Sequence, residues 1–138
     1  LGYAKKRNIC SDRIIFAKRV SRSEHMERLK LANIALDTRI YNGHTTTTDA
    51  LQSGVPVVTV TGNHFASRVS TSLLNAFNLN ELACKNLAEY KDKVKKICLD
   101  EKYKKNLVYK LSSGSAFNDF YDNKRFVAEL EKILTQIL

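Results

Sequence analysis

The sequence has little proline and cysteine, no tryptophan and no long apolar run, and each shortage argues against a class of protein. Its 138 residues include one Pro, three Cys and no Trp. No stretch approaches the roughly 18–20 apolar residues of a membrane-spanning helix, so we expect no membrane association. The cysteines form no C-x-x-C pair and are odd in number, which indicates no disulfide framework and favours a reducing compartment.

Metal-binding and dinucleotide-binding motifs are also missing. His25, His44 and His64 stand far apart, in no H-x-x-x-H or H-E-x-x-H arrangement, so we expect no zinc site. Gly43 and Gly54 are isolated, so the chain has neither a P-loop nor a G-x-G-x-x-G fingerprint. The first residues have no apolar region, so we expect no signal peptide. Because the sequence has no initiating Met, we expect it to be a piece of a larger protein.

What is present is an ordinary hydrophobic content and an excess of positive charge. The chain has 43% hydrophobic residues, 23 basic and 14 acidic side chains and a net charge of +9. The length predicts one compact domain over residues 1–138. Lysines crowd between Lys85 and Lys110, but they alternate with apolar residues at helical spacing, which predicts a solvated helix face. A non-enzymatic nucleic-acid-binding module remains a remote alternative, since no reader motif accompanies the charge.

Short apolar runs alternate with amphipathic stretches in the first two-thirds of the chain, which predicts an α/β fold with parallel strands and crossover helices. The expected strands are 13–17, 34–37 and 56–60. Residues 1–10 are expected to be the tail of a helix. Further helices are expected at 23–32, capped by Ser23, at 48–53, and after the turn at 61–63. From residue 79 onward the pattern predicts helices alone, at 86–99, 101–111 and 123–138, with a polar break at 112–115.

The segment 37–49 is the most informative one, because it follows a strand and opens a helix. In an open parallel sheet, ligands bind beyond the carboxyl ends of the strands, and a helix N-terminus there suits a phosphate. Gly43 permits close backbone approach, and Thr45–Thr48 supply hydroxyl groups. His44 could donate to an anion, and the carboxylate of Asp49 could accept from ribose hydroxyls. On spacing alone, an ordinary helix cap followed by a first-turn acid is an equally good interpretation.

Several motifs together carry a family resemblance. In chain order they are Arg13-Ile14-Ile15-Phe16, Glu24-His25, Leu36-Asp37-Thr38, Asn42-Gly43-His44-Thr45-Thr46, Gly54-Val55-Pro56-Val57-Val58-Thr59 and Ala66-Ser67-Arg68-Val69. This order resembles the O-linked N-acetylglucosamine transferase family, which includes the SPINDLY-type O-fucosyltransferases. The similarity runs from about Leu1 to Leu138 and corresponds to the C-terminal lobe of the catalytic region.

The resemblance implies a GT-B fold, in which two Rossmann-like lobes hold a nucleotide-sugar donor in the cleft between them. This chain would be the C-terminal lobe, with its parallel strands and crossover helices followed by C-terminal helices. The implied reaction is an inverting transfer of N-acetylglucosamine from UDP-GlcNAc to Ser or Thr of intracellular proteins, in the cytoplasm or nucleus. The resemblance implies no metal and no other cofactor.

Individual positions match the family's donor-binding residues. His44, Thr45 and Thr46 match the residues that bind the diphosphate, and Asp49 matches the carboxylate that contacts ribose. His25 and Arg28 match residues that pack on and contact the uridine. Without the resemblance, an ordinary exposed helix residue is an equally good interpretation of His25.

Two further positions depend on less direct matches. Val20 falls where the family reads the uracil edge with backbone atoms. Arg22 replaces a family Lys near the phosphates, which keeps the charge and changes the donor geometry.

The catalytic base and most acceptor contacts of the family lie in the N-terminal lobe, which this sequence lacks together with the tetratricopeptide repeats. No catalytic residue can therefore be assigned, and we expect the isolated 138 residues to have no transferase activity. The N-terminal lobe and protein acceptors are the expected partners, besides the donor. The Asn42–Thr46 motif favours the N-acetylglucosamine branch, whereas the run Thr45–Thr48 resembles the branch that uses GDP-fucose.

Overall fold

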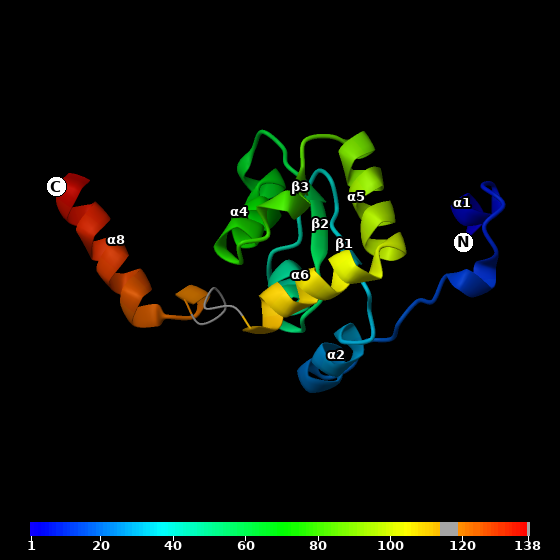
Figure 1. Ribbon diagram of the computed structural model, residues 1–138, viewed down its shortest axis with the longest axis horizontal. Helices are drawn as coiled ribbons and strands as arrows, with labels where there is room; N and C mark the ends of the chain where they lie inside the picture. The colour runs from blue at the N-terminus through cyan, green and yellow to red at the C-terminus, as the bar shows by residue number, and fades with distance from the viewer. Residues whose placement is uncertain (114–118, 138) are drawn as a thin grey trace.

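The computed structural model describes residues 1–113 and 119–137 (Figure 1). Within them, three short strands are interspersed with helices, and the longest helices come last. The elements are α1 (Gly2–Lys5), η1 (Ser11–Arg13), α2 (Arg22–Leu29), β1 (Ala35–Leu36), α3 (Thr45–Gln52), β2 (Val57–Val60), η2 (Phe65–Ser67), α4 (Val69–Ala76), η3 (Asn80–Leu82), β3 (Ala83–Cys84), α5 (Leu87–Leu99), α6 (Glu101–Ser113) and α8 (Asn123–Ile137).

The strands form a parallel sheet in the order β1-β2-β3. Ala35 pairs with Val57 at one side of β2, and Val60 pairs with Cys84 at the other. All four residues of β2 are buried, as expected for a central strand of a sheet covered on both faces. The strand predicted at 56–60 is therefore confirmed, and so are the parallel strands and crossover helices.

Helices on both sides of the sheet complete the core. Figure 1 shows α4 on one side and α5 on the other, with α6 crossing one end, and α3 packs against both α4 and β2. The core cluster consists of Ala50, Leu51, Val55, Val57, Val58, Leu74, Phe77, Leu79, Leu82, Cys84, Ile97, Leu107 and Leu111. Because α3 is tied to this core, its N-terminus is held at the carboxyl-end edge of the sheet.

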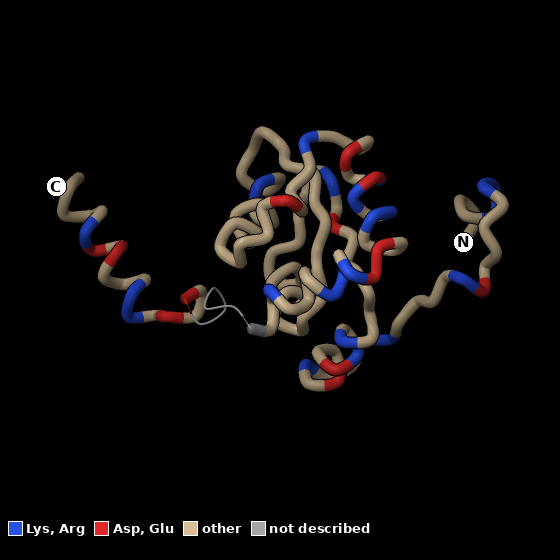
Figure 2. Tube along the Cα trace, in the orientation of Figure 1, with Lys and Arg blue, Asp and Glu red and all other residues tan. Residues whose placement is uncertain are grey.

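The two ends of the chain extend away from the sheet in opposite directions (Figure 1). At the C-terminal end, α8 exposes an apolar stripe made of Phe126, Val127, Leu130, Ile133, Leu134 and Ile137. Figure 2 shows Lys and Arg alternating with Asp and Glu along α5, where most of the lysine side chains are exposed. That pattern confirms the predicted solvated helix face.

The strand predicted at 13–17 is wrong. Ser11–Arg13 forms a 3-10 helix, and 14–20 has no regular structure, with Ile15 and Phe16 exposed. The β-branched and aromatic residues there favour a strand, but a strand persists only when a neighbour takes up its backbone hydrogen bonds. Within the described residues, β1 pairs with β2 alone.

The prediction of helices alone after residue 79 is also wrong, because Ala83–Cys84 forms β3. Two residues are too few to create the alternating pattern that reveals a strand in a sequence. In the first ten residues the expected helix is one turn long, α1. The helices expected at 86–99, 101–111 and 123–138 appear as α5, α6 and α8, while Leu138 and the predicted polar break at 114–115 lie outside the described residues.

Candidate functional site

The loop between β1 and α3 is fixed by a partly buried polar network at the end of β1. The Oδ1 atom of Asp37 accepts hydrogen bonds from the backbone N–H of Thr38 at 2.9 Å and of Gly43 at 2.7 Å. Its Oδ2 atom accepts from the Thr59 hydroxyl at 2.6 Å. Asn42 is fully buried, and its Nδ2 atom donates to the carbonyl of Thr38 at 2.9 Å. The loop therefore has one defined path to the start of α3.

Gly43 lets this loop pass close to the first turn of α3. A Cβ atom at Gly43 would lie 2.5 Å from the Oγ1 atom of Thr46 and 2.6 Å from that of Thr47. The Ser70 hydroxyl lies 2.9 Å from the Thr47 hydroxyl and donates to the carbonyl of Gly43 at 3.1 Å. These contacts tie α3 to α4 and make glycine the residue that fits at position 43.

The N-terminus of α3 carries no side-chain cap. His44 occupies the N-cap position without a capping hydrogen bond from its side chain, and its carbonyl accepts from the N–H of Thr48 at 3.0 Å. The first N–H groups of a helix have no intrahelical partner and carry the positive end of the helix dipole. Thr45 and Thr46 are exposed there. The helix begins three residues before the predicted 48–53, so the threonine run forms its first turn rather than a preceding loop.

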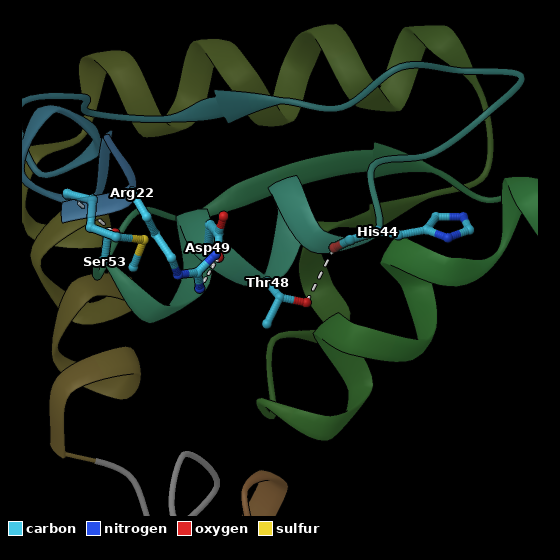
Figure 3. A network of polar contacts seen from close by, with 6 residues as sticks. Arg22, His44, Thr48, Asp49 and Ser53 are labelled. Atoms are coloured by element: carbon cyan, nitrogen blue, oxygen red, sulfur yellow. Dashed lines mark hydrogen bonds and ion pairs between the residues drawn. The ribbon is translucent and has the colours of Figure 1, made fainter. Parts of the chain in front are cut away.

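The imidazole of His44 lies between two aromatic rings. It is stacked on Tyr41 with ring centroids 5.2 Å apart, and the ring of Phe65 stands edge-on at 6.1 Å. Its Nε2 atom is buried and has no hydrogen-bond partner within the described residues. Figure 3 shows the ring directed away from the side of α3 that carries Asp49. The orientation of His44 is thus set by packing, with one polar atom left for a further partner.

Asp49 and Arg22 form an ion pair one turn farther along α3 (Figure 3). The Nη2 atom of Arg22 lies 2.9 Å from the Oδ1 atom of Asp49; the Asp49 side chain is 8% exposed and the Arg22 side chain 67% exposed. A nearly buried carboxylate needs such a partner, because burying an unpaired charge is costly. The Ser53 hydroxyl donates to the carbonyl of Met26 at 3.4 Å and so also connects α2 to α3.

A cleft of about 560 Å³ lies beside the exposed face of α3. It is lined by Arg22, His44, Thr45, Thr48, Asp49, Gln52, Val69, Leu73, Phe120 and Tyr121. Four of the predicted site residues therefore meet in one cleft. Thr48 was expected there only as part of the threonine run that supplies hydroxyl groups. Sequence reasoning missed the others: Gln52 could have been found from the helical spacing of α3, whereas the remaining four come from distant segments and leave no local signal.

The predicted nucleobase contacts lie on and beside α2, outside the lining of that cleft. Ser21 caps α2, accepting at 3.3 Å from the N–H of Glu24, whose side chain bonds back to Ser21, so the predicted cap at Ser23 is wrong. Arg28 donates to the carbonyl of Lys18 at 2.9 Å and lies 3.1 Å from the Nδ1 atom of His25. Val20 is 38% exposed in the preceding segment. Thr46 is exposed at the start of α3 and also does not line the cleft.

Residues 1–113 and 119–137 contain no group of three or more His, Cys, Asp or Glu side chains that could hold a metal ion. In the same residues, no helix is both long and apolar enough to cross a membrane. Within that part of the chain, the polar chemistry of the cleft is carried by the first turns of α3 and by the Arg22–Asp49 pair.

Comparison with known proteins identifies the family. The sequence profile described as Glycosyl transferase family 41 matches residues 1–130. The chain belongs to glycosyl transferase family 41. It is 33% identical over 98% of its length to a UDP-N-acetylglucosamine–peptide N-acetylglucosaminyltransferase of Caenorhabditis elegans. It is 34% identical over 80% of its length to a probable enzyme of the same description, SPINDLY, of Solanum lycopersicum. The predicted family resemblance is confirmed.

A solved structure shares the fold of this family 41 chain. A mutant of the Thermobaculum terrenum O-GlcNAc transferase superposes on 96% of the chain with a TM-score of 0.89 and 30% sequence identity. The expected fold class, the α/β lobe of a GT-B transferase, is therefore confirmed. The chain corresponds to 25% of that structure and spans 12% of the length of each of the two relatives.

Proposed function

We propose that this chain supplies the donor site of a protein O-glycosyltransferase that transfers N-acetylglucosamine from UDP-GlcNAc to Ser or Thr. The observation that carries the proposal is the uncapped N-terminus of α3, which opens into the cleft next to the Arg22–Asp49 pair. A nucleoside diphosphate needs hydrogen-bond donors and positive charge at its phosphates, and an acceptor for its ribose hydroxyls. Family membership supports the same assignment.

Each side chain would have a separate task. The free N–H groups of the first turn, the hydroxyls of Thr45 and Thr46, and the unpartnered Nε2 atom of His44 would bind the diphosphate. The guanidinium of Arg22 is exposed enough to reach a phosphate while it stays paired with Asp49. The Oδ2 atom of Asp49 makes no hydrogen bond within the described residues and would accept from a ribose hydroxyl.

We assign the nucleobase to the region next to the cleft, where α2 meets α3. There Arg28 bridges His25 and the backbone of Lys18, which fixes the imidazole relative to the segment that carries Val20. A fixed imidazole can stack on a base, and the backbone at Val20 can read its edge. No metal is needed to neutralise the phosphates in this scheme, because Arg22 and the α3 dipole supply the positive charge.

Calorimetric titration of the 138-residue chain with UDP, in the presence and absence of EDTA, tests the proposal. We expect measurable binding that EDTA does not change. His44→Ala should bind UDP about 10- to 150-fold more weakly, since a hydrogen bond to a charged group contributes about 1.5–3 kcal/mol. His64→Ala is the matched control, because His64 is an exposed loop histidine away from the cleft. Equal affinity of the wild type and His44→Ala would refute the diphosphate assignment.

A second donor, GDP-fucose, is favoured by one feature of the chain. The first turn of α3 consists of four consecutive threonines, Thr45–Thr48, which resembles the SPINDLY branch. Parallel titrations with UDP and GDP distinguish the two donors: tighter binding of UDP supports N-acetylglucosamine, and tighter binding of GDP supports fucose.

We further propose that the apolar stripe of α8 packs against another part of the same transferase, the N-terminal catalytic lobe. Its six residues are between 43% and 76% exposed here. The superposition on the larger O-GlcNAc transferase covers 96% of the chain, which leaves too few residues outside to omit α8. A polypeptide corresponding to that lobe should co-purify with the chain, and Leu130→Glu should abolish the association; retention of the complex by that variant would contradict the proposal.

Under this proposal the isolated chain binds the donor without transferring its sugar. The catalytic base and the contacts to protein acceptors would belong to the lobe that α8 packs against. Intracellular acceptors would place the complete enzyme in the cytoplasm or nucleus. Transfer from UDP-GlcNAc to a Ser- or Thr-containing peptide by the 138 residues alone would refute this division of labour.

A further inference from the structure

Residues 119–122 pack against the core and contribute to the lining of the cleft. Phe120 packs against Phe77, with ring centroids 5.0 Å apart and planes inclined by 39°. Phe77 is 2% exposed and belongs to the core cluster, against which Phe120 packs as a half-buried residue. The segment is therefore attached to the same core that fixes α3.

Tyr121 extends from this attachment into the cleft. Its ring stands edge-on to that of Phe120, with centroids 5.0 Å apart and planes at 85°. Tyr121 is 40% exposed and lines the cleft together with Arg22 and Asp49. Burial raises the pKa of its hydroxyl above the ordinary tyrosine value; the carboxylate of Asp49 adds to that rise and Arg22 opposes it. The hydroxyl therefore lies within the field of the ion pair that we assign to the ribose and phosphate end of the donor.

The cleft has one polar and one apolar wall. The polar wall is the face of α3, with Thr45, Thr48, Asp49 and Gln52. The apolar wall consists of Val69, Leu73, Phe120 and Tyr121. A nucleoside diphosphate divides its chemistry in the same way: phosphates and ribose hydroxyls form hydrogen bonds, whereas the flat faces of the base and sugar pack on apolar and aromatic groups.

We propose that Tyr121 is a donor-binding residue whose ring packs against the nucleoside of the nucleotide sugar, opposite Asp49. This inference rests on the proposed function, because it takes a nucleoside diphosphate as the occupant of the cleft. Phe120 acts as a positioning residue, since its ring contacts both Phe77 and Tyr121. The donor site then includes a segment more than 70 residues away from the α3 motif in the sequence.

Calorimetric titrations with UDP and with inorganic pyrophosphate test the role of Tyr121. Tyr121→Ala should bind UDP about tenfold more weakly, the factor that 1.4 kcal/mol of aromatic stacking corresponds to. Its affinity for pyrophosphate should stay within twofold of wild type, because pyrophosphate has no nucleoside. Tyr121→Phe keeps the ring and should retain most of the UDP affinity. Tyr3→Ala is the matched control, since Tyr3 is an exposed tyrosine of α1.

The pattern across the two ligands separates this inference from the proposed function. If the wild type binds UDP and His44→Ala weakens both ligands, but Tyr121→Ala binds UDP as tightly as wild type, the inference is wrong and the donor site stands. If Tyr121→Ala weakens UDP and pyrophosphate equally, the residue acts on folding alone and the inference is again wrong. If the wild type binds neither ligand, the proposed function and the inference fail together.

Discussion

Replacing Gly43 by alanine would insert a methyl group where the loop passes the first turn of α3. The added carbon would lie 2.5 Å from the Oγ1 atom of Thr46 and 2.6 Å from that of Thr47. These separations are well inside van der Waals contact, so neighbouring atoms have to move. Thr46 is exposed and can rotate its side chain away, whereas Thr47 is 4% exposed and pairs with the Ser70 hydroxyl.

The cost of Gly43→Ala follows from this difference between the two threonines. Moving Thr47 breaks its hydrogen bond to Ser70, which contributes about 1 kcal/mol to stability. The extra methyl group adds an overpacking cost of about 1–3 kcal/mol. We expect the free energy of unfolding to fall by about 2–4 kcal/mol in total. The displaced first turn of α3 should also bind UDP more weakly.

Urea denaturation followed by circular dichroism measures the free energy of unfolding, and calorimetry measures UDP affinity. Gly2→Ala is the control, because a Cβ atom there meets nothing within 4 Å and Gly2 lies in α1. Alanine favours helix over glycine by roughly 0.5–1 kcal/mol, so this variant should lose no stability. Unchanged stability and unchanged UDP affinity of Gly43→Ala would refute the close packing between the loop and α3.

Two further predictions concern the cysteines and an acidic residue of the fold. In the native chain a thiol reagent should modify the exposed Cys10 and Cys98. It should react with Cys84 only on unfolding, because Cys84 is buried and burial raises the pKa of its thiol. Rapid modification of all three cysteines in the native chain would contradict the burial of Cys84. Burial raises the pKa of Glu81, but the hydrogen bond and charge of Lys110, a backbone hydrogen bond and the charge of Lys93 together lower it below the ordinary value. The Glu81–Lys110 pair therefore stabilises the fold above the unfolded pKa of Glu81 and loses this contribution, roughly 0.5 kcal/mol, as pH falls from about 5 to 3. In urea titrations at several pH values, the free energy of unfolding of Glu81→Gln should fall less on acidification than that of the wild type. An identical loss in both proteins would disprove the pairing.

The sequence predicted the elements whose signals are long or strongly periodic. The β-branched run Val57–Val60 indicated β2, and the helices after residue 86 followed from their 3.6-residue spacing. Short elements were not predictable in this way. β3 contains two residues, and the segment 13–17 has strand-forming residues but no strand to pair with.

The candidate site could be predicted only where it is contiguous in sequence. His44, Thr45 and Asp49 lie within two turns at the start of one helix, so local spacing pointed to them. Arg22 joined them through the family resemblance. The apolar wall comes from α4 and from Phe120 and Tyr121, and no local pattern brings such distant residues together, because their approach depends on how the core packs.

The central claim is that the N-terminus of α3 binds the diphosphate of a nucleotide-sugar donor. Heteronuclear NMR of the 138-residue chain during titration with UDP tests it most directly, because each backbone N–H gives a separate signal. We predict that the amide signals of Thr45 and Thr46 shift most, and that His44→Ala weakens the response. Shifts confined to the lysine-rich helices α5 and α6, with the amides of α3 unchanged, would contradict the claim.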